Sequence, residues 1–302
     1  MRRSVLLFAA GMLLFGAAGA AAESYTVLTY NVGLLRVMGS DLVPLVAARA
    51  AAAPAALAGL AAARMPQVML LEEVWRDQDA HGLLGLTSGL LLLVHAPLSV
   101  VDWSFTPFTR STFFDSFARK GVLQATLQDG SSGARFVLVG THTVALDTDN
   151  GVPRDRAQVA AVLSQIAMVR AALAARSQDG ALPGLVLGDF NVGPGYVDEA
   201  YRAILGTGNL REAGAAVNEA PFVTWDPQNP LVHYGGYPHE PPAKIDHVFL
   251  QDAPGAAWSV QGAEVVMKDP VPGLVLKPRR DLEVPAPLSD HYAFLTQVTL
   301  SR

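Results

Sequence analysis

The chain has 302 residues, of which 51% are hydrophobic, so it is long and apolar enough to bury a large core. It contains no cysteine, which excludes disulfide cross-links and leaves stability to the core and to any bound metal. The formal net charge is −5, with 22 basic and 27 acidic residues. This acidic balance argues against nucleic acid as the main ligand, because proteins that track phosphates present a basic surface.

The first 22 residues predict a secretory signal peptide. Arg2 and Arg3 precede an apolar run through Phe15, and an Ala-x-Ala sequence ends near Ala22. We therefore expect export, to the periplasm or the medium, and a mature chain of residues 23–302 with 20 basic and 27 acidic residues. We expect that chain to fold as one domain, because it shows neither an internal repeat nor a linker.

The mature chain begins with a predicted strand. Residues 24–31 alternate and are rich in β-branched and aromatic side chains, and this strand ends at the amide of Asn31. Residues 41–64 are rich in alanine and predict helical turns that break at Pro44 and Pro54. Two arginines in this segment argue against a membrane span, and we favour core packing over a lipid-facing surface as the reason for its apolar residues.

Two further apolar stretches follow. Residues 67–75 predict a buried strand that ends in paired carboxylates, Glu72 and Glu73. Because neighbouring residues of a strand face opposite sides, we expect only one of them in a site, with a solvated acidic turn as the alternative. Residues 88–105 predict two strands around Pro97, and their near absence of charge indicates central strands.

A predicted β-hairpin comes next, with strands at 117–128 and 134–146 around an Asp-Gly-Ser-Ser-Gly turn. The second strand leads to His142, which is placed for phosphate contact or acid–base chemistry, with a hydrogen-bonded surface imidazole as the alternative. Lys120 stands beside a glycine at the start of the first strand. It is a candidate substrate-phosphate contact, although base rates favour an ordinary surface lysine.

Residues 154–176 carry an apolar stripe at helical spacing, and a short apolar run then leads to Asp189 and Asn191. The alternation of a strand directs these two side chains to the same face. A carboxylate and an amide together suit Mg²⁺ or Ca²⁺, or a polarised water beside a phosphate. An Asx-rich turn is the alternative for these two residues alone. Residues 196–205 predict a short helix.

The last third of the chain contains a long loop at residues 221–242, dense in proline, glycine, tyrosine and tryptophan. Ordered loops of this kind often shape substrate pockets. A strand with Asp246 near its start follows. The final strand, residues 293–300, is entered through Asp290 and His291, an acid–imidazole pair at a strand edge.

Six short motifs place these polar residues at strand ends, in the order LTYN, LLEEVW, GTHT, LGDFN, KIDHVFL and LSDH. Across essentially the whole mature chain they resemble the DNase I-like endonuclease/exonuclease/phosphatase superfamily. The resemblance implies an α/β (α+β) fold, a four-layer α/β/β/α sandwich of two packed mixed β-sheets with the site in a cleft at one edge. It also implies metal-dependent attack of water on a phosphoester.

The resemblance also implies a set of metal ligands. Asn31 and Glu73 would be ligands and Asp290 would assist them, with Mg²⁺ expected and Mn²⁺ or Ca²⁺ as alternatives. Family members commonly carry glutamine where this chain has Glu72. That difference is expected to add negative charge beside the ligand.

A catalytic group is implied in the same way. Asp189 would orient or deprotonate the attacking water, and Asn191 and His142 would hold phosphate oxygens. His291, oriented by Asp246, would stabilise charge on the phosphorane.

The finer resemblance concerns the segments FARKGVLQATL, GTHTVA and TWDPQNPL, which are similar to secreted and neutral sphingomyelinases of the phospholipase C type. We therefore predict an exported metal-dependent phosphodiesterase that hydrolyses a phospholipid headgroup and makes peripheral contact with a membrane surface. No protein partner is evident. A secreted nuclease is the first alternative, and a catalytically silent binding protein of the same fold is the second.

Overall fold

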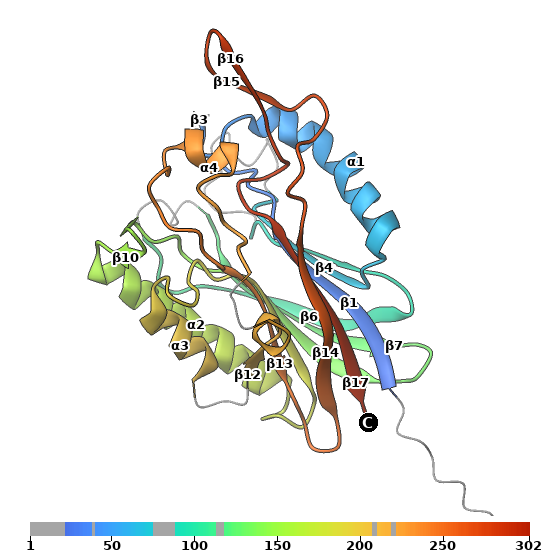
Figure 1. Cartoon of the computed structure of the whole chain (residues 1–302). Helices are drawn as coiled ribbons and strands as arrows, with labels where there is room; N and C mark the ends of the chain where they lie inside the picture. The colour runs from blue at the N-terminus through green and yellow to red at the C-terminus, as the bar shows by residue number, and fades with distance from the viewer. Residues whose placement is uncertain (1–21, 38–39, 75–87, 113–117, 207–209, 219–221) are drawn as a thin grey trace, which may run out of the picture.

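The computed structural model describes residues 22–37, 40–74, 88–112, 118–206, 210–218 and 222–302, and its backbone is drawn in Figure 1. The predicted signal peptide lies outside these residues apart from Ala22, which begins the first strand. The strand predicted to start at residue 24 and end at Asn31 is present and extends over Ala22–Asn31.

The first of two large sheets has five strands, and both the N-terminal and the C-terminal strand belong to it. In spatial order the strands are β14 (Ala257–Val266), β17 (Ala293–Ser301), β1 (Ala22–Asn31), β4 (Val68–Glu72) and β5 (Leu91–Val94). β1 runs parallel to β4 and antiparallel to β17, so this sheet is mixed.

The second large sheet has six strands and is also mixed, since β8 and β11 run parallel while the other pairs are antiparallel. In spatial order the strands are β12 (Leu210–Glu212), β13 (Asp246–Gln251), β11 (Gly184–Asp189), β8 (Arg135–His142), β7 (Gly121–Asp129) and β6 (Leu98–Pro107). The predicted hairpin is confirmed as the antiparallel pair β7 and β8.

Helices and short hairpins complete the described structure. The helices are α1 (Val46–Arg64), α2 (Arg156–Arg176), α3 (Asp198–Leu205), α4 (Pro230–Gly235) and the 3₁₀ turn η3 (Gly214–Ala216). The two-stranded ribbons are β2 (Arg36–Val37) with β3 (Ser40–Asp41), β9 (Thr148–Asp149) with β10 (Val152–Pro153), and β15 (Val275–Arg279) with β16 (Leu282–Pro285). The β15–β16 ribbon projects from the body of the molecule in Figure 1.

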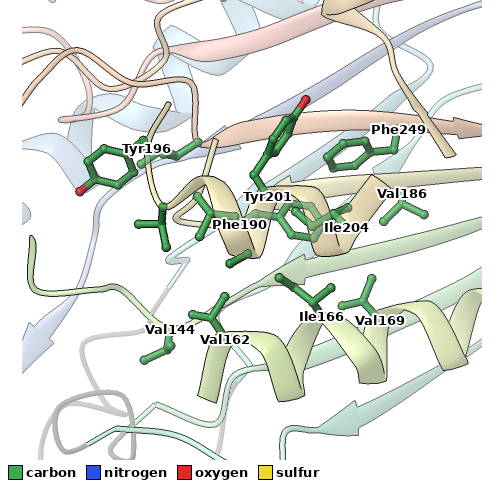
Figure 2. Packing of buried hydrophobic residues seen from close by; sticks show 14 of the residues in the cluster. Val144, Val162, Ile166, Val169, Val186, Phe190, Tyr196, Tyr201, Ile204 and Phe249 are labelled. Carbon is green, nitrogen blue, oxygen red and sulfur yellow. The ribbon is translucent and has the colours of Figure 1, made fainter. Parts of the chain in front are cut away.

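Three hydrophobic clusters separate four layers, which confirms the α/β/β/α sandwich. Strand alternation sends Leu185 and Leu187 of β11 into the cluster between the two sheets, and sends Val186 into the cluster under α2 and α3. Figure 2 shows that outer cluster, with Ile166 of α2 and Ile204 of α3 packed over the sheet. The third cluster lies between α1 and the first sheet.

Two local predictions are wrong. The helix around Pro54 does not break, because α1 runs unbroken from Val46 to Arg64 with that proline inside it. Interior proline costs a helix about 3 kcal/mol, and packing of the buried face onto the first sheet outweighs that cost here. The chain does turn before α1, at Pro44, as predicted.

The strands around Pro97 are not central. β5 is the edge strand of the first sheet and β6 is the edge strand of the second, so the proline marks the corner where the chain passes from one sheet to the other. Several of their apolar side chains face solvent, including Leu93 and Trp103, which is 67% exposed. An uncharged apolar run therefore did not distinguish an edge strand from a buried one. Residues 257–266, which form β14, were not recognised as a strand.

Candidate active site

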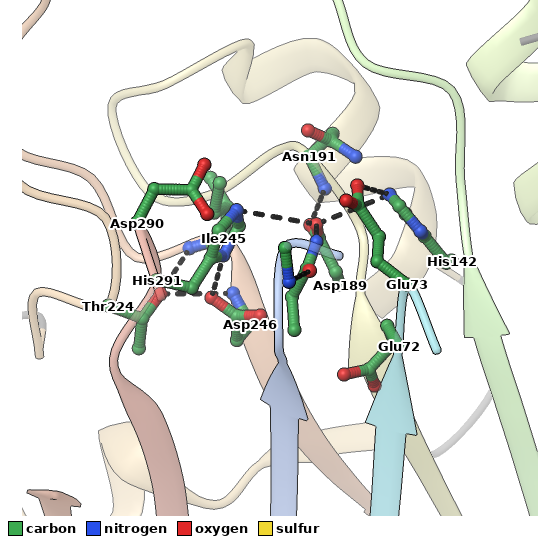
Figure 3. Close-up of polar contacts among 12 residues, drawn as sticks. Glu72, Glu73, His142, Asp189, Asn191, Thr224, Ile245, Asp246, Asp290 and His291 are labelled. Carbon is green, nitrogen blue, oxygen red and sulfur yellow. Dashed lines mark hydrogen bonds and ion pairs between the residues drawn. The ribbon is translucent and has the colours of Figure 1, made fainter. Parts of the chain in front are cut away.

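The predicted site residues come together where strands of both sheets end (Figure 3). In the second sheet the strand register places His142 beside Asp189, and Asp189 beside Asp246. In the first sheet Asn31 is paired with Glu72, so Glu73 follows directly at the same edge. The sandwich thus brings together side chains that are far apart in the sequence.

Asp189 is the centre of this group. Its Oδ2 accepts a hydrogen bond from Asn31 Nδ2 at 2.9 Å and lies 3.4 Å from His142 Nε2 and 3.8 Å from His291 Nε2. Burial raises the pKa of Asp189 to about 6, against the opposing charge of His291. A carboxylate with a pKa near neutrality, facing two imidazoles, is suited to accept a proton from water.

Asn191 is held beside Asp189 by a turn and not by strand alternation, which corrects the prediction. The strand ends at Asp189, and the backbone N–H of Asn191 donates to Asp189 Oδ1 at 2.8 Å. Asn191 adopts the left-handed conformation with φ of 52°, which asparagine tolerates better than most residues. Its Nδ2 donates to the carbonyl oxygen of Thr143 at 3.1 Å.

Asp246 and His291 are in contact, as the family resemblance implies. The two side chains meet at 2.9 Å between Asp246 Oδ2 and His291 Nδ1, and both are buried. Burial alone would lower the pKa of His291, but the carboxylates of Asp246 and Asp189 outweigh it and raise the pKa well above the ordinary value. The ring therefore carries a positive charge near neutral pH, with Nε2 directed toward Asp189.

His142 and Lys120 form a second pair. The Lys120 Nζ atom lies 3.0 Å from His142 Nε2 and also donates to the carbonyl oxygen of Thr143 at 3.0 Å. Burial lowers the pKa of His142 well below its ordinary value, with further contributions from the positive charges of Lys120 and His291, so this imidazole is neutral. Lys120 is 5% exposed and lies inside the site, so it is not the ordinary surface lysine that was the alternative.

The two adjacent glutamates point in different directions. Glu73, in the left-handed conformation at φ of 57°, lies at the site with Oε1 3.9 Å from His142 Nε2. Glu72 is fully buried and accepts a hydrogen bond from Thr29 Oγ1 at 2.7 Å. Burial, together with the charge of Asp246, raises the pKa of Glu72 well above its ordinary value. Burial therefore disfavours the charge that Glu72 was expected to add beside the ligand.

A divalent cation fits the side chains predicted to bind it. Burial and the neighbouring carboxylate of Asp290 raise the pKa of Glu73 to about 7, and a bound cation would offset both effects. Asn31 adds an amide oxygen, which accepts from the Gly33 N–H at 2.8 Å. Carboxylate and amide oxygens are the ligands that Mg²⁺ prefers. The assignment of Asn31, Glu73 and Asp290 as ligands stays a prediction.

A different group also has metal-ligand spacing. One ligand atom from each of Asp189, Asp246 and His291 lies within 4.8 Å of the other two. The hydrogen bond between Asp246 and His291 already occupies Nδ1 of the ring and one carboxylate oxygen. We therefore interpret this group as acid–base machinery and not as a metal site.

The sequence did not identify two residues, Asn229 and Trp225, that bond to the backbone of the segment carrying Asp290 and His291. Asn229 Nδ2 donates to the carbonyl oxygens of Ser289 at 2.9 Å and Asp290 at 3.1 Å. Trp225 forms a backbone bridge with His291. Both lie in the TWDPQNPL segment of the 221–242 loop, which was expected to shape a substrate pocket, but the particular residues that contact the site segment could not be identified from the sequence.

The sequence of residues 28–291 matches the profile of the Endonuclease/Exonuclease/phosphatase family. This range contains every predicted site residue. A comparison with curated proteins finds no match.

Solved structures with the same fold include enzymes with different substrates. Sphingomyelinase C from Streptomyces griseocarneus is 21% identical with a TM-score of 0.65, and the alignment covers 91% of this chain and 99% of that one. Staphylococcus aureus beta toxin with bound magnesium ions is 15% identical with a TM-score of 0.65, covering 91% and 99%. D. rerio TDP2 complexed with a single-strand DNA product is 14% identical with a TM-score of 0.63, covering 91% and 98%. At these identities the likeness shows the fold alone.

Proposed function

Because the chain belongs to the endonuclease/exonuclease/phosphatase family of phosphoester hydrolases, we propose that it is an exported metal-dependent phosphodiesterase that cleaves a phospholipid headgroup. One observation carries the catalytic part of the proposal. Asp189 Oδ2 lies between the neutral His142 and the charged His291, and Asp246 fixes the second ring. A base, a neutral imidazole and an imidazolium thus face one small volume at the edge of two rigid sheets.

Each side chain has a definite task in this proposal. A divalent cation held by Asn31, Glu73 and Asp290 would supply Lewis-acid neutralisation of the phosphate. Asp189, with its pKa near 6, accepts a proton from the attacking water. The His291 Nε2–H donates to a non-bridging phosphate oxygen as negative charge develops, and Asp246 keeps that ring protonated and oriented.

The choice of a choline phospholipid as substrate rests on separate support. The TWDPQNPL segment, which resembles sphingomyelinases, lies against His291 through Trp225 and holds the Asp290 backbone through Asn229. The expected mature chain has more acidic than basic residues, which suits a lipid headgroup better than a polyanion. Two of the structures with this fold are a sphingomyelinase and a beta toxin.

Product analysis tests the proposal. The purified protein is incubated with Mg²⁺ and vesicles of sphingomyelin or phosphatidylcholine, and in parallel with plasmid DNA. We expect release of phosphocholine, abolished in Asp189→Asn and retained in Asp198→Asn, which alters an acid ion-paired to Arg202 at the surface. Rapid plasmid nicking without phosphocholine would replace the lipid assignment with the nuclease alternative. Vesicle binding without hydrolysis of either substrate would support the silent binding protein.

A further inference from the structure

Arg49 is the largest fully buried side chain among the described residues. Its guanidinium group has five N–H donors, and all of its hydrogen bonds go to backbone carbonyl oxygens. The acceptors are Pro44 O at 2.9 Å from Nε, Val32 O at 2.9 Å and Leu288 O at 3.2 Å from Nη1, and Gly33 O at 2.6 Å and Val43 O at 3.3 Å from Nη2. A buried charge held in this way fixes the geometry of its acceptors, because no water can replace the bonds.

The acceptors lie on three segments that are distant in the sequence. Val32 and Gly33 directly follow Asn31, at the end of β1. Leu288 precedes the turn that carries Asp290. The third segment, at residues 43–44, leads into α1. The Arg49 side chain thus links the backbone segment that follows Asn31 to the segment that precedes Asp290. Asn31 and Asp290 are two of the three predicted metal ligands.

Gly33 shows how closely these segments approach one another. A Cβ atom at position 33 would lie 2.5 Å from Asp290 Oδ1 and 3.1 Å from Arg49 Nη1, and the residue has φ of 61°. Ser289 adds a further link, since its Oγ donates to the carbonyl oxygen of Asn31 at 2.7 Å. The Asn31 and Asp290 segments are therefore held against each other by contacts that involve no ligand.

We propose that Arg49 is a positioning residue that holds Asn31 and Asp290 at the separation needed to bind a divalent cation. This inference rests on the metal-dependent function proposed above. Arg49 touches neither the substrate nor the cation, and it acts through the carbonyl oxygens of Val32, Gly33 and Leu288. Loss of such supporting hydrogen bonds around a metal site typically costs about 10–100-fold in metal affinity or activity.

The conservative variant Arg49→Lys tests this role, because it keeps the positive charge and the long side chain but cannot reach all five carbonyls. Arg64→Lys is the matched control, since Arg64 lies on the same helix in an exposed ion pair with Glu264. The melting temperature of each full-length protein is measured during titration with MgCl₂, so that cation binding is read without any substrate. For Arg49→Lys we expect the Mg²⁺ midpoint to rise at least about tenfold and kcat to fall, with both unchanged in Arg64→Lys.

Other outcomes overturn the proposal. If Arg49→Lys lowers the melting temperature but leaves the Mg²⁺ midpoint and kcat as in the wild type, Arg49 serves stability alone. If this variant does not fold, hydrogen exchange on the wild-type protein replaces it. Mg²⁺ should then protect amides at residues 32–34 and 288–290 together, and protection of one segment alone would overturn the proposal.

The same titration separates this inference from the proposed function. A raised Mg²⁺ midpoint in Arg49→Lys supports the positioning role even if no phospholipid is hydrolysed. Hydrolysis of phospholipid with an unmoved midpoint supports the proposed function and overturns the positioning role.

Discussion

Asp246 and His247 are neighbours on β13 but belong to two separate buried groups of charged side chains, in which the carboxylate pKa values shift in opposite directions. Asp246 faces the active site and pairs with His291. His247 faces the helices, stacks on Tyr201 of α3 and lies 3.7 Å from Glu212. Both groups combine a carboxylate with an imidazole in the protein interior, so residue types alone do not distinguish the proposed catalytic group from the other one.

The group around His247 is electrically balanced. Lys244 Nζ lies 2.7 Å from Glu212 Oε1, and the two side chains are 2% and 4% exposed. Burial alone would raise the pKa of Glu212, but Lys244 and His247 lower it to about 2. Lys244 Nζ also lies 3.4 Å from the centroid of the Phe294 ring. We call Glu212, Lys244 and His247 the structural charge cluster.

The active site is not balanced in the same way. Burial raises the pKa of Asp189 to about 6 and that of Glu73 to about 7, so keeping these two carboxylates ionised in the folded protein costs free energy. The Glu212 carboxylate is already neutralised by Lys244 and needs no further partner. The carboxylates of Asp189 and Glu73 are stabilised in the folded protein when they bind a cation or a proton. The comparison predicts that substitutions in the two groups separate stability from activity.

The largest expected effect is on stability, at the structural charge cluster. Glu212→Gln removes the charge that compensates the buried Lys244, and breaking such a pair costs about 3–5 kcal/mol of unfolding free energy. We expect kcat to stay close to that of the wild type at temperatures where the variant is folded. Urea denaturation and steady-state kinetics measure the two quantities. The double variant Glu212→Gln/Lys244→Met should recover part of the stability, and a loss of kcat without loss of stability would reverse the comparison.

The next effect is on catalysis. His291→Gln should lower kcat roughly a hundredfold, because one preorganised donor to the developing phosphate charge is worth about that much. Its melting temperature should change little. His247→Gln is the matched control on the other face of β13, where the ring contacts Val192 O at 2.8 Å, and it should lower the melting temperature while kcat is retained. Equal loss of kcat in both variants would show that the two imidazoles are not functionally distinct.

The pH dependence of stability distinguishes the two groups in the metal-free protein. Because the folded-state pKa values of Glu73 and Asp189 are raised, the folded protein binds protons that the unfolded chain has lost between about pH 3.8 and pH 7. Stability should therefore fall as pH rises through this window, and Mg²⁺ should restore it.

Glu212 has the opposite sign. Its depressed pKa contributes stability that is present above about pH 4.5 and is lost as pH falls toward 2. Chemical denaturation across pH 3–8 with and without EDTA measures both effects. Glu73→Gln should flatten the decline in stability between pH 5 and 7. An unchanged slope in that variant would show that the titration of Glu73 does not cause the decline.

The smallest expected effect is on the metal requirement. Glu73→Gln should raise the Mg²⁺ concentration for half-maximal activity about tenfold. Glu72→Gln should leave it within about twofold, because burial already keeps Glu72 in its neutral form and glutamine has the same shape. Excess EDTA should remove activity and leave the protein folded. The reverse ranking of the two glutamine variants would assign metal binding to Glu72.

Much of the site could be predicted because its residues lie next to apolar runs, some at the end of a strand and others at its start. Asp189, His142 and Asp246 lie abreast for that reason, since parallel and antiparallel register carries the ends of neighbouring strands to one edge. The four layers follow from the same alternation of apolar residues.

The rest depended on contacts between segments that are distant in the sequence. Arg49 was read only as an interruption of an apolar segment, because nothing local indicates that five carbonyls converge on it. Glu212 lies in a short unremarkable strand, and its pairing with Lys244 comes from the adjacency of β12 and β13. Exposure of β5 and β6 likewise depends on which strands have a neighbour on both sides.

The position of β17 links the acquisition of activity to the completion of folding. β1 pairs with β17 from Ala22, opposite Ser301, to Thr29, opposite Phe294, and the segment leading into β17 carries Asp290 and His291. Contacts of such long sequence separation form late and slowly. The pairing of β17 with β1, which brings the predicted catalytic residue His291 to the site, is therefore expected late in folding. A chain that ends before residue 290 lacks both Asp290 and His291, so under the proposed mechanism it lacks the proposed donor to the developing phosphate charge.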